Sequence, residues 1–216
     1  MVAKVITIAQ QKGGAGKTTI ASNLAVALAQ SNKNSVAVLD TDPQGSMGRW
    51  CITREENFAD KKGVAQLTLR TASAWGARYE ARSLAKEHDF VVIDTPPKMG
   101  LDGRPAVEAA DLVLVPMTPS EMDKWATEPT LELIEREKQD SLIVLNRVNP
   151  RTNLVQRMRA EIPKMGVKLA KTEINQRVIY ADVISSGLSV LEKSPSSEAA
   201  KEILALRKEI MRRLKD

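Results

Sequence analysis

The stretch "KVITIAQQKGGAGKTTIASNLAVALAQ", residues 4–30, decides the fold of this chain. It begins with an apolar run, Val5 to Ala9, of the length of a buried strand, and it ends with helical spacing from Thr18 to Gln30. The glycines between them leave room for a phosphate to approach the backbone amides at the N-terminus of the helix. A strand, a glycine-rich turn and a helix in this order predict a phosphate-binding loop.

Side chains of this loop match the needs of a nucleoside triphosphate. Lys17 supplies positive charge to the phosphates, the hydroxyl of Thr18 is placed to ligate Mg²⁺, and Thr19 adds a donor near the α-phosphate. The residues expected to contact the nucleotide here are Gly13, Gly14, Ala15, Gly16, Lys17, Thr18 and Thr19. The loop departs from the usual pattern, GxxxxGK followed by Ser or Thr, because Gln11 replaces the first glycine and Lys12 follows it. Taken alone, Lys12 is typical of a solvated surface lysine.

Apolar runs of strand length recur along the chain and alternate with segments of helical spacing. Buried strands are expected at Val5 to Ala9, Val36 to Leu39, Phe90 to Ile93, Leu112 to Val115 and Leu142 to Leu145, with one more in "GVAQLTL" from Gly63. Helices are expected at Thr18 to Gln30, Ala74 to His88, Glu121 to Lys138 and Ser196 to Lys215. This alternation predicts an α/β fold: a doubly wound, mostly parallel sheet flanked by helices, in a single domain over residues 1–216. The ligand is expected at the carboxyl ends of the strands.

Three aspartates directly follow expected strands. Asp40 and Asp42 lie in "LDTDPQGS", and Asp94 lies in "VVIDTPP". A parallel sheet brings both segments beside the phosphate-binding loop, where carboxylates can hold a metal-bound water or reach Mg²⁺. A single aspartate after a strand is more often a helix cap or a turn residue. Three of them beside such a loop predict a Mg²⁺-dependent nucleoside triphosphatase.

Composition narrows the cellular setting and the partners. With 43% hydrophobic residues among 216 the chain can bury a full core, in or near which Trp50, Trp75 and Trp125 are expected to pack. The single cysteine, Cys51, leaves no intrachain disulfide and favours a reducing cytosol, and neither a signal peptide nor a membrane span is expected. The net charge of +5 is uneven, since residues 145–216 hold 15 Lys and Arg against 8 Asp and Glu. This asymmetry indicates nucleic acid or an anionic membrane as a partner, although a solvated helical face has the same pattern.

The motifs resemble those of the ParA/MinD class of deviant Walker-type ATPases, most closely the small ParA-like ATPases. "KGGAGKTT", "LDTDPQGS" and "VVIDTPP" are the most specific matches, "VLNRVNP" and "VIYADVISSGLSVLE" are weaker ones, and the resemblance extends over nearly the whole chain. It implies a cytoplasmic, nucleoid-associated ATPase that uses ATP and Mg²⁺ and forms an ATP-dependent sandwich dimer with a second copy of itself.

The resemblance also implies a role for each site residue. Lys12 matches the signature lysine, which reaches across the dimer to the phosphates held by the other subunit, and its charge there acts much as an arginine finger does. Lys17 binds the phosphates of its own subunit, and Asp42 positions the hydrolytic water. Metal contacts are implied for Thr18, Asp40 and Asp94, and nucleotide contacts for Arg147 and for Asn146, which would read the adenine.

ParA-like proteins bind DNA nonspecifically as ATP dimers, and a ParB-like or cargo-adaptor protein stimulates hydrolysis and releases them. The resemblance thereby implies that the chain segregates or positions a plasmid, a chromosome region or a protein cargo over the nucleoid. Arg177 lies near the DNA-contacting segment of the family. Further candidate DNA contacts are Arg151, Arg157, Lys168, Lys171, Arg207, Arg212, Arg213 and Lys215, although each alone is more often a plain surface charge.

A MinD-like membrane protein is the alternative, because the last expected helix has a basic face and an aliphatic one. Ser196 or Ser197 is expected to cap this helix. Its apolar face is expected to contain Ala200, Ile203, Leu204, Ile210, Met211 and Leu214. Since the helix holds no Trp or Phe and directly follows the last segment of the fold, a closing helix of the domain is favoured over a membrane anchor. The nitrogenase iron-protein branch needs two cysteines in each subunit, which Cys51 alone cannot provide.

Overall fold

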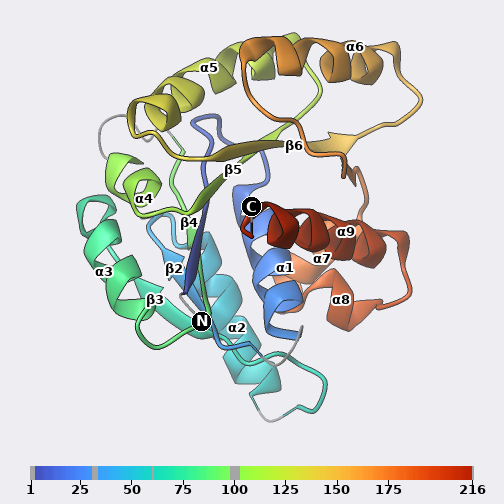
Figure 1. Cartoon of the computed structure of the whole chain (residues 1–216). Helices are drawn as coiled ribbons and strands as arrows, with labels where there is room; N and C mark the ends of the chain where they lie inside the picture. The colour runs from blue at the N-terminus through green and yellow to red at the C-terminus, as the bar shows by residue number, and fades with distance from the viewer. Residues whose placement is uncertain (1–2, 31–33, 60, 98–102, 216) are drawn as a thin grey trace.

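The computed structural model describes residues 3–30, 34–59, 61–97 and 103–215, and its strands form one sheet (Figure 1). The strands are β1 Lys4–Ile8, β2 Val36–Asp40, β3 Thr68–Thr71, β4 Phe90–Asp94, β5 Leu112–Met117, β6 Ser141–Val148 and β7 Ile174–Asn175. This seven-stranded sheet has the order β3-β2-β4-β1-β5-β6-β7, and every neighbouring pair of these strands runs parallel. The prediction of a mostly parallel sheet is confirmed.

Helices cover both faces of the sheet, so the fold is doubly wound as predicted (Figure 1). One face is covered by α1 Lys17–Gln30, α2 Ser46–Phe58, α7 Ile179–Ser186, α8 Val190–Lys193 and α9 Glu198–Arg213. The other face is covered by α3 Ala77–Leu84, α4 Arg104–Glu108, α5 Glu121–Arg136 and α6 Asn153–Glu161. Short 3₁₀ turns lie at Ala74–Gly76 and Ile162–Met165.

The central strands are continuously apolar because side chains from both of their faces are buried. Along β2, Val36 and Val38 pack into the layer that contains α1, whereas Ala37 and Leu39 pack into the layer that contains α3. Successive side chains of a strand point to opposite faces of the sheet. A strand that is buried on both faces therefore needs an apolar residue at nearly every position.

The register of three strands places the predicted loops side by side. In the sheet, Asp94 at the end of β4 lies beside Ile8 of β1 on one side and beside Asp40 of β2 on the other. The loops that follow these three strands therefore leave the same edge of the sheet, which is the arrangement expected for a ligand site in an open α/β fold.

Two elements differ from their prediction. The strand expected in "GVAQLTL" from Gly63 begins only at Thr68, because Gly63 has a φ of +88° and belongs to a turn. The helix expected from Ala74 to His88 is shorter: a 3₁₀ turn comes first, and α3 ends at Leu84. The helices α2, α4, α6, α7 and α8 and the strand β7 were not predicted.

The C-terminal helix α9 closes the core. Ser197 caps it by accepting a hydrogen bond from the backbone N–H of Ala200 at 3.2 Å, as predicted. Its buried face consists of Ala199, Ala200, Ile203, Leu206 and Ile210, with Met211 and Leu214 partly buried against the same core. Leu204 was wrongly placed on this face, because its side chain is 41% exposed. No helix among the described residues is both long and apolar enough to cross a membrane.

Only one of the three tryptophans is a core residue. Trp50 is buried, donates its Nε1–H to the carbonyl of Leu188 at 3.0 Å, and lies under the guanidinium of Arg54. Trp75 and Trp125 are 81% and 61% exposed, so the prediction of core packing is wrong for both. Trp75 lies in the 3₁₀ turn that follows the edge strand β3, and Trp125 lies on the outer face of α5.

Candidate nucleotide-binding site

The glycine-rich loop connects β1 to α1 at the carboxyl edge of the sheet, where the sequence predicts a phosphate site. Gly14 and Gly16 have φ values of +75° and +91°, which side-chain-bearing residues rarely adopt. At Gly16 space is also lacking, since an added Cβ would lie 2.2 Å from Nδ2 of Asn146. The same Nδ2 donates a hydrogen bond to the carbonyl of Ala15 at 2.8 Å. Asn146 of β6 therefore stabilises the loop through this hydrogen bond.

Lys17 begins α1 and is buried at the base of the loop. Burial lowers the pKa of its ammonium group, and the carboxylates of Asp94 and Asp42 act in the opposite direction. The buried lysine thus lies near enough to both carboxylates to feel their charge. In this position its charge is screened less by water than at the surface, which strengthens its attraction to a bound phosphate.

Asp94 and Thr18 form the part of the site that suits a metal ion. The hydroxyl of Thr18 donates to Oδ2 of Asp94 at 2.6 Å. The other oxygen, Oδ1, is buried and has no hydrogen-bond partner among the described residues. Burial above all, with the nearby charges of Asp40 and Asp42, raises the pKa of Asp94 to about 7. A buried carboxylate oxygen without a partner, next to a hydroxyl, fits a hard cation such as Mg²⁺.

Asp40 and Asp42 lie in the same hollow but have different surroundings. Both oxygens of the buried Asp40 carboxylate accept backbone hydrogen bonds, from the N–H of Asp42 at 3.0 Å and of Gly48 at 2.7 Å. Burial raises the pKa of Asp40, and these two bonds oppose the rise. Asp42 is less buried, and its Oδ1 accepts from the N–H of Gln44 at 2.9 Å. Asp40 thus fixes the shape of this loop, while Asp42 is the carboxylate within it that reaches solvent.

The described acidic residues do not form a protein-only metal cage. Among them no group of three or more His, Cys, Asp or Glu could hold a metal ion. In nucleotide sites generally, Mg²⁺ is bound by one or two protein oxygens together with phosphate oxygens and water.

The first residues of the loop are tied to α5 on the other side. Nε2 of Gln10 donates to the hydroxyl of Thr127 at 2.8 Å, and the N–H of Gln11 donates to the hydroxyl of Thr130 at 3.3 Å. Nζ of Lys12 forms an ion pair with the carboxylate of Asp123. These partners could not be found from the sequence because more than 100 residues separate them from the loop. The only local signal is the sequence Ser-Glu-Met-Asp at residues 120–123, which is typical of the start of a helix.

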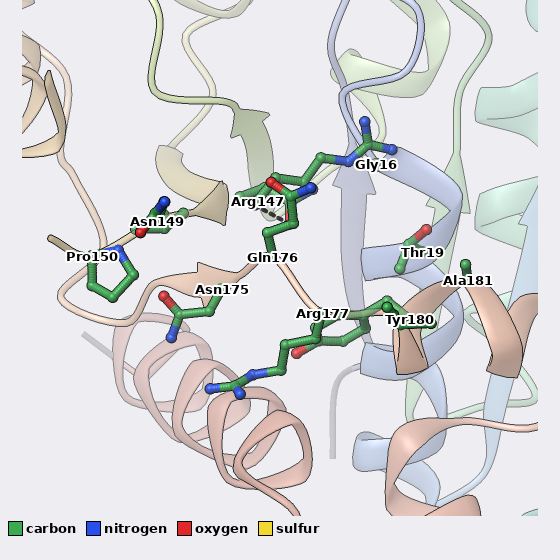
Figure 2. A pocket seen from close by; sticks show the side chains of 13 residues that line it. Gly16, Thr19, Arg147, Asn149, Pro150, Asn175, Gln176, Arg177, Tyr180 and Ala181 are labelled. Atoms are coloured by element: carbon green, nitrogen blue, oxygen red, sulfur yellow. Dashed lines mark hydrogen bonds between the residues drawn. The ribbon is translucent and has the colours of Figure 1, made fainter. Parts of the chain in front are cut away.

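A cleft of about 960 Å³ extends from the loop toward the C-terminal third of the chain (Figure 2). Its walls include Gly16 and Thr19 on one side and the segments 146–150 and 175–181 on the other. Figure 2 shows the side chain of Arg147 extended toward Gly16. Both polar atoms of the predicted adenine reader Asn146 already bind backbone: Nδ2 binds Ala15, and Oδ1 accepts from the N–H of Arg147 at 2.9 Å. Asn146 is thus buried with both polar atoms bonded, whereas Arg147, which also lines the cleft, is exposed.

The candidate DNA-binding residues fall into two groups. Three form ion pairs within the chain: Arg157 with Glu121, Arg177 with Glu202 and Arg213 with Asp140. In Figure 2 the guanidinium of Arg177 points away from the loop, toward α9. Within the described residues the other candidates form no ion pair: Arg151, Lys168, Lys171, Arg207, Arg212 and Lys215.

Several of these cations line one hollow, which we call the basic cleft. It has a volume of about 840 Å³ and lies between the segment 166–172 and the C-terminal half of α9. Its basic residues are Lys168, Lys171, Lys208, Arg212 and Arg213, and in the described part of the chain Glu209 is the one acid that lines it. Both carboxylate oxygens of Glu209 accept backbone hydrogen bonds, from the N–H of Lys171 at 2.8 Å and of Thr172 at 3.1 Å. The carboxylate therefore binds the backbone rather than the basic side chains of the cleft.

Comparison with known proteins agrees with the geometry of the loop. The family model described as "CobQ/CobB/MinD/ParA nucleotide binding domain" matches residues 6–190. The chain belongs to this family. The matched residues include the glycine-rich loop, both aspartate loops and the wide cleft beside them, so the family relationship covers the whole candidate site.

Relatives and solved structures of the ParA/MinD family extend over most of the chain. "Maintenance of carboxysome distribution protein A" from Halothiobacillus neapolitanus is 30% identical over 202 residues, which cover 90% of this chain and 90% of that protein. "Chromosome partitioning protein ParA" from Myxococcus xanthus is 28% identical over 256 residues, and the match covers 98% of this chain and 89% of that protein. An ATP complex of McdA from Cyanothece has a TM-score of 0.77 at 18% identity, covers 97% of both chains and shows the same fold. The chain is thus a ParA/MinD-family ATPase, a group with members in positioning and partitioning.

Proposed function

We propose that this ParA/MinD-family protein forms a homodimer when it binds ATP, holds nonspecific double-stranded DNA in that state, and positions a cargo over the nucleoid by hydrolysing ATP. The observation that carries this proposal is the different placement of the two loop lysines. Lys17 is buried at the base of the loop, whereas the side chain of Lys12 is 39% exposed at its rim. A lysine at the rim is within reach of the phosphates held by a second copy.

The residues at the base of the loop take the roles of a phosphoryl-transfer site. Lys17 and the loop amides bind the phosphates, and Thr18 and Asp94 hold Mg²⁺, which neutralises charge on the phosphates when bound. Asp42, the more exposed carboxylate, orients the attacking water, while Asp40 keeps the Asp42 loop in shape through its two backbone hydrogen bonds. Arg147 and its neighbours in the wide cleft contact the nucleoside.

Duplex DNA is the partner proposed for the basic cleft. Cations there that form no ion pair with described residues release condensed counterions from DNA on binding, whereas cations already in ion pairs contribute less. This favours Lys168, Lys171 and Arg212 over Arg157 and Arg177 as DNA contacts. A ParB-like or other adaptor protein that stimulates hydrolysis completes the proposed cycle.

The membrane alternative finds no support in α9. A membrane-binding helix needs an available apolar face, but Ile203, Leu206 and Ile210 are buried against the core. Exposing them would cost about 1.5–3 kcal/mol for each side chain. Nucleoid association is therefore preferred to membrane association.

The test of the proposed function compares the wild-type protein with Lys12→Gln. Light scattering should show a wild-type monomer without nucleotide and a dimer with ATP and Mg²⁺, and only the dimer should be retained on random-sequence duplex DNA. Lys12→Gln should bind ATP as a monomer, and its hydrolysis rate should fall by at least about 100-fold, because a cation supplied across an interface is worth about 10³–10⁵ in rate.

Lys62→Gln is the matched control, since Lys62 is exposed and lies outside the loop. It should dimerise like the wild type. A normal ATP-induced dimer of Lys12→Gln would contradict the role of Lys12. Retention of the wild-type protein on anionic liposomes but not on DNA would favour the membrane alternative.

A further inference from the structure

Lys12 has a partner within its own chain, and the proposed reaction leaves that partner without a role. Nζ of Lys12 forms an ion pair with Oδ1 of Asp123 in the first turn of α5. The lysine side chain is 39% exposed, whereas that of Asp123 is only 3% exposed. The ammonium group is therefore accessible at the surface, and the carboxylate that holds it is in the interior.

The backbone of Asp123 is held in place at the start of α5. The N–H of Asp123 donates to the capping hydroxyl of Ser120 at 3.0 Å, and its carbonyl accepts from the hydroxyl of Thr127 at 2.7 Å. The same Thr127 hydroxyl accepts from Gln10 at 2.8 Å, so the beginning of the loop and the beginning of α5 are joined. The backbone of Asp123 cannot follow Lys12 away from this position without breaking these contacts.

Lys12 is the cation that pairs with Asp123. The neighbouring Lys124 lies on the same helix, but its ammonium group pairs with Glu121 at 2.8 Å and with Glu161. Among the described residues no second ion pair to Asp123 is formed. When Lys12 leaves, a nearly buried carboxylate is left without its countercharge, which opposes the departure.

One ammonium group cannot hold its own Asp123 and the phosphates of a second copy at the same time. We infer that Asp123 is a positioning residue that retains Lys12 in the nucleotide-free subunit and releases it only to the phosphates of an ATP-bound partner copy. This inference rests on the proposed function. A triphosphate carries more negative charge than one carboxylate. Transfer of the Lys12 ammonium group from Asp123 to ATP is therefore favoured over its transfer to a nucleotide with fewer phosphates.

Asp123→Asn tests the inference, because it removes the charge and keeps the shape and the capping contacts of the backbone. The ATP concentration for half-maximal dimerisation, measured by light scattering with Mg²⁺ present, should fall about fivefold or more, as expected for loss of a partly exposed charge pair that opposes assembly. Glu121→Gln is the matched control: it removes the same charge from the same helical turn, and Glu121 pairs with Lys124 and Arg157 rather than with Lys12. Its ATP requirement should equal that of the wild type.

A second measurement does not depend on dimerisation. In the nucleotide-free wild-type protein, an amine-reactive reagent followed by peptide mass spectrometry should label Lys12 several-fold more slowly than the exposed Lys62, and Asp123→Asn should remove the difference. Equal labelling of the two lysines in the wild type would overturn the inference even if Asp123→Asn failed to fold.

The outcomes separate this inference from the proposed function. A wild-type dimer with an unchanged or higher ATP requirement in Asp123→Asn would overturn the role of Asp123 and leave the function standing. A wild-type protein that stays monomeric with ATP and Mg²⁺ would overturn the proposed function, and the inference with it.

Discussion

Gly16 is the residue at which the loop has no room for a side chain. Its φ is +91°, and a methyl group added to its Cα would lie 2.2 Å from Nδ2 of Asn146. Any replacement must displace Asn146, and with it the hydrogen bond to Ala15 that braces the loop. Gly76, which precedes α3 and lies outside the loop, has an ordinary φ of −81°, and a Cβ there would come no closer than 3.3 Å, to Oγ of Ser73.

Gly16→Ala should therefore abolish ATP binding, whereas Gly76→Ala, outside the site, should leave it unchanged. The strained backbone should also lower the free energy of unfolding of Gly16→Ala by about 1–3 kcal/mol. Calorimetric titration with ATP and Mg²⁺, together with urea unfolding of both variants, checks this pair. Wild-type affinity in Gly16→Ala would mean that Asn146 moves freely and does not brace the loop.

At the residue scale the sequence predicted which groups meet, but their individual contacts came from the structure. Lys17, Thr18 and Asp94 could be placed together because each lies at a set distance from the end of a parallel strand. The hydrogen bond from the N–H of Gly48 to Asp40 could not be predicted, since it depends on where α2 begins. The exposure of Trp75 and Trp125 could not be predicted either, because the size of a side chain does not show which face of its element is covered.

At the scale of elements, one buried ion pair joins α2 to α8. The guanidinium of Arg54 donates to both oxygens of Glu192, and it also donates to the carbonyls of Ala65 and Gly187. Both side chains are buried. Burial alone would raise the pKa of Glu192, but Arg54 and the backbone N–H groups of Ala65 and Ser189 outweigh it and lower the pKa.

Glu192→Gln should lower the free energy of unfolding by about 3–5 kcal/mol, because it leaves the buried guanidinium without its countercharge. Glu198→Gln is the control, since Glu198 forms an exposed pair with Lys201 and its loss should leave the stability almost unchanged. Urea unfolding at neutral pH measures both. Equal stability of the two variants would show that the Arg54–Glu192 pair does not hold α2 to α8.

The same pair gives a direction for acid unfolding. The pKa of Glu192 in the folded protein lies below its ordinary value of 4.5, so its stabilising contribution is complete above pH 4.5 and is lost as the pH falls through the folded pKa. Between pH 6 and pH 3, the free energy of unfolding should therefore change less in Glu192→Gln than in the wild type.

Element prediction succeeded where local patterns are strong. The helix α1 and the strands at the centre of the sheet have long apolar segments of one period, and all were predicted. The helices α2, α6 and α7 were missed because only a few of their residues are buried, such as Val155 and Met158 in α6. Their stability depends on packing against the sheet rather than on a strong pattern of their own.

At the scale of the whole molecule, the basic cleft lies away from the nucleotide site. Its segments, the chain before β7 and the C-terminal half of α9, approach the beginning of β6, since Arg213 contacts Asp140 and Ser141. The nucleotide loop lies at the opposite, carboxyl edge of the sheet. Two subunits joined through their ATP sites would therefore keep both basic clefts free for DNA.

Lys168→Gln combined with Arg212→Gln should weaken binding of the ATP-bound protein to random duplex DNA by about tenfold, and it should reduce the slope of log affinity against log salt by about 2. Lys62→Gln with Lys86→Gln is the control, because it removes the same charge from exposed positions outside the cleft. Fluorescence anisotropy over a salt series measures both double variants. Equal loss in the two would show that net charge, and not the basic cleft, governs DNA binding.

The sequence by itself determined the chemistry of the loop and the type of sheet that presents it. Both depend on short-range order: a strand, a glycine-rich turn and a helix, and aspartates that directly follow strands. Only the tertiary structure decided which charges are available. Lys12 pairs with Asp123, 111 residues away, and Arg177 is neutralised by Glu202, while Lys168 and Arg212 gather in one cleft. Such pairings join segments that are distant along the chain, so no local pattern of residue types can specify them.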